Sequence, residues 1–106
     1  MSNEILMPRT LDAVVVALCA DYERRAVEIA EKRVPFNVTM EYRFLNYRML
    51  NAAMEIAGEM DALSFINEIG KKRSCYDTAT YLSESVYKTR KREVKLNIAR
   101  RLSLIG

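Results

Sequence analysis

The chain has no histidine and no tryptophan, and only three glycines, two prolines and two cysteines occur among its 106 residues. Histidine is the commonest general base near neutral pH and the commonest ligand of transition metals, so its absence removes the usual basis for either kind of site. The sequence also lacks a glycine-rich phosphate loop and a nucleophile turn of the Gly-x-Ser-x-Gly type. We therefore expect a protein that is not an enzyme and that holds no metal and no cofactor. Cys19 and Cys75 lie far apart in the sequence, so we expect free thiols and no disulfide.

The scarcity of glycine and proline leaves few places where the chain can turn. Half of the residues are hydrophobic, as in a folded soluble protein, and Ala, Leu, Met, Glu, Lys and Arg, which favour helices, are abundant. A chain of 106 residues is long enough for one core but not for two independent cores. The composition predicts a single all-α domain over residues 1–106.

Apolar residues at three- and four-residue spacing predict four to five helices after a loose arm at residues 1–9. The first is one helix of about six turns, capped by Thr10 and ended by Pro35. The second follows a cap at Thr39, and Gly70 closes a short third helix. We expect the two long helices to form an antiparallel pair within a helical front half, residues 10–70.

Residues 71–106 have the pattern of a basic, helix-turn-helix-like unit. A short helix begins at Ser74, the stretch Leu-Ser-Glu-Ser breaks the pattern at residues 82–85, and a last helix runs from about Glu84 to Leu104. Its buried row is expected to begin at Val86 or Tyr87 and to include Val94 and Ile98.

The charge is divided unevenly along the chain. Residues 1–70 hold 7 Lys and Arg against 11 Asp and Glu, a balance of −4, whereas residues 71–106 hold 10 against 3, a balance of +7. A basic segment of this kind favours a polyanionic partner, although a last helix whose Lys and Arg simply face solvent would give the same count.

Basic and hydroxyl side chains at the start of the last helix are the candidate DNA contacts. A helix fits the major groove, where its first turns reach base edges while other Lys, Arg, Ser and Thr residues hold phosphates. The expected base-facing residues are Glu84, Ser85, Lys88, Thr89 and Arg92, with the Ser83 and Ser85 hydroxyl groups at the helix start. The expected phosphate contacts are Lys71, Lys72, Arg73, Lys91, Lys95, Arg100 and Arg101.

Residues 81–105, YLSESVYKTRKREVKLNIARRLSLI, resemble the C-terminal part of phage transcription regulators of the ArpU and RinA kind, in which a similar turn precedes a Tyr and basic residues. Those regulators are similar to region 4 of sigma factors, a helix-turn-helix fold that binds promoter DNA. The resemblance covers about a quarter of the chain, and the stretch after the Tyr is less aromatic than usual in the family. It implies DNA-contacting roles for Ser83, Ser85, Tyr87, Lys88, Lys91 and Arg92. The first 70 residues are similar to uncharacterised clostridial and phage proteins, which implies no activity.

These patterns predict a phage-type transcriptional regulator that binds double-stranded DNA and forms a homodimer. The alternative is a helical module for protein–protein interaction or self-association. The longest apolar stretch, near LDAVVVALCA, is too short to span a bilayer, and the N-terminus has no secretion signal. We therefore expect a cytoplasmic protein without a membrane partner.

Overall fold

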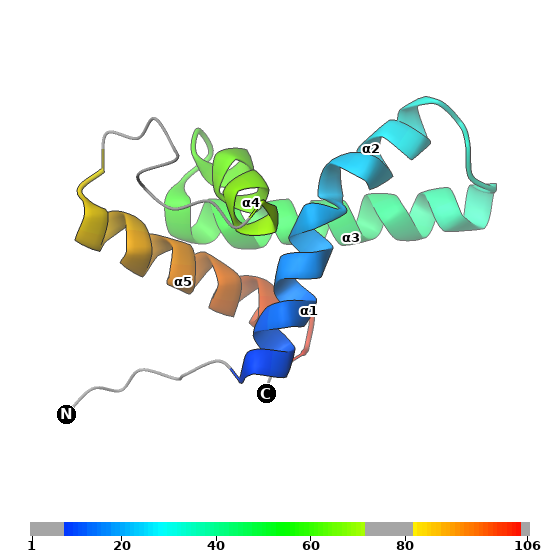
Figure 1. The fold of residues 1–106 in the computed structure, drawn as a ribbon. Coiled ribbons are helices and arrows are strands. Elements are labelled where there is room, and N and C mark those ends of the chain that lie inside the picture. The colour runs from blue at the N-terminus through cyan, green and yellow to red at the C-terminus, as the bar shows by residue number, and fades with distance from the viewer. Residues whose placement is uncertain (1–7, 72–81, 105–106) are drawn as a thin grey trace.

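The structure, a computed structural model, describes residues 8–71 and 82–104. These residues form five helices: α1 (Arg9–Ala20), α2 (Tyr22–Ala30), α3 (Phe36–Ala57), α4 (Ala62–Gly70) and α5 (Glu84–Arg101). No strand occurs in the described part, so the predicted all-α fold is confirmed (Figure 1). The short helix expected from Ser74 lies outside the described residues, as does Cys75.

The prediction of one long first helix is wrong, because the chain turns at Asp21 and continues as α2 in a different direction (Figure 1). The guanidinium group of Arg25 donates to the carbonyl oxygen of Leu18 at 2.8 Å, in the last turns of α1. Helices change direction where a side chain bonds to the carbonyl groups of the helix ladder. The bend at Asp21 therefore coincides with a side-chain hydrogen bond across it, which apolar spacing does not record.

Two helices begin directly after a proline: α1 after Pro8 and α3 after Pro35. Thr10 and Thr39, the expected caps, lie inside these helices, so both cap predictions are wrong. Proline is pre-organised at a helix start because its fixed φ fits the first turn and its missing N–H group would have no partner there.

The core lies where α1, α4, α5 and the C-terminal part of α3 meet. Val94 and Ile98 are fully buried, as expected from their spacing. Cys19 is a free, buried thiol, and desolvation raises its pKa to about 12. The remaining large core side chains include Val15, Met49, Phe65, Ile66, Ile69 and Tyr87.

The hairpin formed by α2 and the first half of α3 projects away from this core (Figure 1). Buried residues of α3 begin at Asn46, and the buried residue of α2 is Arg25. Arg25 Nε donates to Asn46 Oδ1 at 2.7 Å, and Asn46 Nδ2 donates to the carbonyl oxygen of Tyr22 at 3.1 Å. This polar pair fastens the base of the hairpin to the bend between α1 and α2.

Candidate nucleic-acid interface

The N-terminal end of α5 is capped by Ser83, whose Oγ accepts a hydrogen bond from the backbone N–H of Val86 at 3.4 Å. The first N–H groups of a helix have no partner within the helix, so this end of α5 carries partial positive charge. The spacing allows the cap to be Ser83 or Ser85, and the structure shows that it is Ser83.

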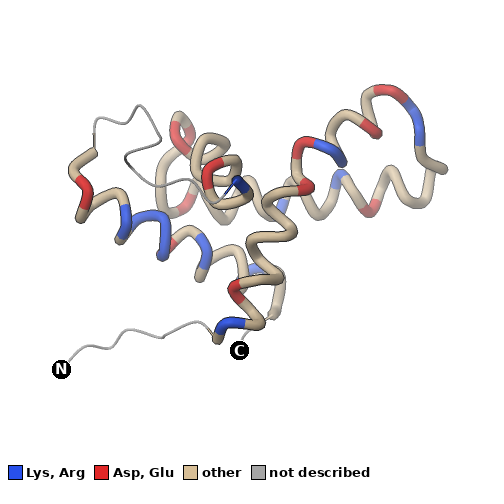
Figure 2. The backbone as a smooth tube through the Cα atoms, in the orientation of Figure 1, with Lys and Arg blue, Asp and Glu red and all other residues tan. Residues whose placement is uncertain are grey.

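The expected base-facing residues of α5 are all exposed. Ser85, Lys88, Thr89 and Arg92 follow one another at spacings that place them on the same side of the helix. Lys88 Nζ forms an ion pair with Glu84 Oε1 at 2.8 Å, and the Lys88 side chain is still 65% exposed. Figure 2 shows that Lys and Arg recur along the whole of α5.

Tyr87 lies on the opposite side of α5 and is buried. Its ring stacks on Phe65 with centroids 5.6 Å apart, and its hydroxyl group donates to Glu68 Oε2 at 2.8 Å. A side chain that is 1% exposed and packed against α4 is not placed to touch DNA. Tyr87 holds α5 against α4, and we leave it out of the interface that the family resemblance implies.

Lys91 and Lys95 also lean toward the body of the protein. Lys95 Nζ lies 3.0 Å from Asp12 Oδ1, and its side chain is 23% exposed, so this pair links α5 to α1. Lys91 Nζ lies 5.8 Å from the centroid of the Tyr87 ring. These two lysines are half-buried and are less suited to phosphate contacts than the exposed residues of α5.

Lys71, at the C-terminal end of α4, is exposed. It lines a shallow hollow together with Glu68, the carboxylate that accepts from Tyr87. Arg100 is exposed, whereas Arg101 is engaged with Glu55 on α3. Lys72 and Arg73 lie outside the described residues.

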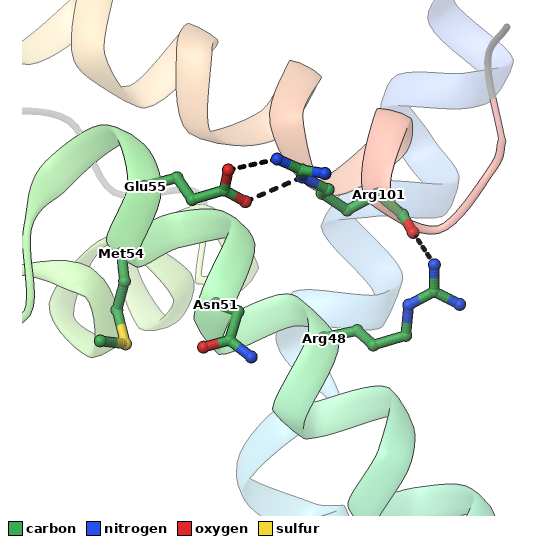
Figure 3. A pocket seen from close by; sticks show the side chains of 5 residues that line it. All are labelled: Arg48, Asn51, Met54, Glu55 and Arg101. Carbon is green, nitrogen blue, oxygen red and sulfur yellow. Dashed lines mark hydrogen bonds and ion pairs between the residues drawn. The ribbon is translucent and has the colours of Figure 1, made fainter.

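A second feature, not anticipated from the sequence, is a hollow of about 580 Å³ where α3 meets the end of α5 (Figure 3). Its lining residues are Arg48, Asn51, Met54, Glu55 and Arg101. Arg101 Nε donates to Glu55 Oε1 at 2.8 Å, and this hydrogen bond lowers the pKa of the Glu55 carboxyl group. Arg48 donates to the backbone carbonyl oxygen of Arg101. The pair of Arg101 and Glu55 joins residues that are 46 positions apart, so no local sequence pattern indicates it.

Within residues 8–71 and 82–104, no group of three or more acidic or cysteine side chains lies together as a metal site would require. In the same part of the chain, every helix is too short or too polar to cross a membrane.

The chain matches no protein-family model, no curated protein and no solved structure. Its resemblance to phage regulators therefore stays a prediction, and its function has to be inferred from the surfaces described above.

Proposed function

We propose that the protein is a DNA-binding protein, not an enzyme, and that it acts as a phage-type transcriptional regulator. The supporting observation is one exposed side of α5 that begins at a capped helix end and carries cations and hydroxyl groups. We call this surface the α5 basic face; its residues are Ser85, Lys88, Thr89, Arg92 and Arg100. A single helix fits the major groove of DNA, so this face is suited to docking there.

Each part of the face has a role in this proposal. The hydroxyl groups of Ser85 and Thr89 lie in the first turns, where a recognition helix reaches base edges. Lys88 and Arg92 lie beside them and supply hydrogen bonds to bases or phosphates, while Arg100, at the far end of the face, and Lys71, at the end of α4, supply further phosphate contacts.

The proposal is tested by titrating labelled duplex DNA with the protein at several salt concentrations. Four exposed cations, Lys71, Lys88, Arg92 and Arg100, each neutralising one phosphate, give a slope of log affinity against log salt of about −3 to −4. Replacing Lys88 and Arg92 together by Ala is expected to weaken binding and make the slope shallower by about 2. Circular dichroism checks that the double variant keeps its fold, as exposed substitutions usually do.

A matched control removes two positive charges from the opposite end of the molecule. Lys32→Asn with Arg33→Ala changes the exposed turn between α2 and α3, and Asn tolerates the positive φ of 55° at position 32. We expect this variant to bind DNA almost as well as the parent chain. If both double variants weaken DNA binding equally, the attraction comes from the overall charge and not from the α5 basic face. If the parent chain does not bind DNA at low salt, the DNA-binding proposal is wrong.

Self-association is a second candidate function, favoured by a different surface on α3. The two functions do not compete, because the α5 basic face and the exposed apolar residues of α3 belong to different helices.

A further inference from the structure

The projecting half of α3 carries a row of large apolar side chains that face solvent. Phe36 is 80% exposed, Met40 50%, Phe44 62% and Tyr47 66%. Their spacing of four, four and three residues places them along one side of the helix. We call these four residues the α3 apolar row.

The row is larger than scattered surface hydrophobics explain. The exposed parts of the three aromatic side chains and of Met40 together present about 500 Å² of apolar surface on each chain. A patch of this size commonly marks an interaction site. Paired with an equal patch, it gives an interface of about 1,000 Å², which is near the lower limit for a specific complex.

The row continues into the hollow where α3 meets the end of α5. Asn51 and Met54 follow Tyr47 at four and seven residues along the same side of α3 and line this hollow (Figure 3). The most exposed aromatic residue, Phe36, stands at one end of the row, and the hollow lies at the other.

Opposite charges flank the row on one edge. Glu41 is exposed, and Arg48 lies seven residues farther along, so both side chains occupy the same edge of α3. The Arg48 guanidinium carbon lies 5.4 Å from the centroid of the Phe44 ring, so this cation borders the middle of the row.

From this arrangement we infer that a second copy of the chain covers the row, with two α3 helices packed antiparallel about a twofold axis near Phe44. The axis places Met40 of each copy opposite Tyr47 of the other and brings Phe36 to the hollow beside Asn51 of the other. It also sets Glu41 of each copy near Arg48 of the other. A twofold interface requires a surface that complements itself, and here apolar side chains meet apolar side chains while Glu41 and Arg48 bring opposite charges together along one edge.

The oligomeric state, measured by sedimentation equilibrium without DNA, tests the inference. We expect the parent chain to dimerise in the micromolar range, since an interface near 1,000 Å² is a weak one. Phe44→Glu places two carboxylates at the axis and is expected to weaken the dimer at least about 100-fold while leaving the fold intact. Met60→Glu, at a side chain that is 94% exposed but outside the row, is expected to leave the dimer unchanged.

A parent chain that stays monomeric overturns the inference. The same result is expected if the α3 apolar row binds a different protein. A Phe44→Glu variant that dimerises as tightly as the parent overturns it as well. Neither result affects the DNA-binding proposal, because that proposal concerns α5 and is measured separately.

Cross-linking tests the position of the axis. In a Cys75→Ser background, Phe44→Cys is expected to form a disulfide-linked dimer on mild oxidation, whereas Met60→Cys is not. Cys19 does not interfere, because its thiol is 2% exposed and burial raises its pKa to about 12. A dimer that cross-links through Met60→Cys and not through Phe44→Cys would place the interface elsewhere.

Discussion

Two neighbouring arginines on α2 have opposite environments. Arg24 is exposed and forms ion pairs with Asp21 at 3.3 Å and with Glu28 at 3.1 Å. Arg25 is 3% exposed, and desolvation lowers its pKa, an effect that the charge of Asp21 opposes. Its hydrogen bonds go to neutral acceptors: the Asn46 side chain, the carbonyl oxygen of Leu18 and the sulfur atom of Met49. Arginine suits this position because the several N–H donors of its planar guanidinium group can bind acceptors on different helices at the same time.

Arg25→Ala is expected to lower the free energy of unfolding by about 3 kcal/mol, because it removes two charge-assisted hydrogen bonds to oxygen and one to sulfur and leaves buried acceptors without donors. Urea denaturation followed by circular dichroism measures this loss. Asn46→Ala removes the same contact from the other side, so the double variant should lose less than the sum of the single losses. Arg24→Ala is the matched control and should change stability far less; equal losses at the two positions would mean that Arg25 does not fasten the bend.

Spacing in the sequence assigns Arg24 and Arg25 alike to the polar face of a helix. What separates them is Asn46, a partner 21 residues away that only the folded chain brings near. Helical spacing leaves either Val86 or Tyr87 as the first member of the buried row of α5, and the partners that decide for Tyr87, Phe65 and Glu68, lie on α4. The exposure of the α5 basic face could be predicted because it follows from helix geometry alone.

Contacts between helices account for the bend after α1 and for the glycine at the end of α4. The apolar pattern from residue 11 to residue 30 is unbroken, so periodicity predicts one helix where the structure has two. The glycine expected to close the third helix does end α4, but its φ is not positive. A Cβ atom at Gly70 would lie 2.6 Å from the backbone N of Ala20. Gly70 is therefore required by the close approach of α4 to the end of α1 and not by the geometry of a C-terminal cap.

Gly70→Ala tests this explanation through the sign of its effect. Helix propensity alone predicts that Ala stabilises a helical position by about 0.5 to 1 kcal/mol relative to Gly. Backbone atoms of Ala20 cannot move aside as a flexible side chain does, so we expect instead a loss of about 1 to 3 kcal/mol in the free energy of unfolding. Ser64→Ala, at an exposed position of the same helix, should change it by less than about 0.5 kcal/mol. A stabilised Gly70→Ala variant would show that the contact with α1 is loose.

The whole molecule consists of a core and a projecting hairpin, with extents of 48 × 33 × 22 Å. The α5 basic face belongs to a helix of the core, whereas the α3 apolar row belongs to the hairpin (Figure 1). A dimer formed through the hairpins would therefore leave the first turns of α5, with Ser85, Lys88, Thr89 and Arg92, uncovered in each copy. This separation of surfaces is compatible with a regulator that binds DNA as a dimer, since such proteins commonly read paired half-sites.

Hydrogen–deuterium exchange should reveal the two parts of the molecule and their response to association. Residues 36–45 of α3 include no buried side chain, and α2 buries only Arg25, so the hairpin should open locally at a lower free energy than α4 and α5. At low protein concentration we expect faster exchange in α2 and in residues 36–45 than in residues 46–57. Raising the concentration into the range where the chain dimerises should slow exchange in the hairpin and leave the core unchanged.

The Phe44→Glu variant is the control for this response, because its hairpin should exchange at the same rate at every concentration. If the chain dimerises but exchange in the hairpin does not slow, the copies associate through another surface. If the hairpin is as well protected as the core at low concentration, the polar pair of Arg25 and Asn46 couples it to the core more tightly than its sparse burial predicts.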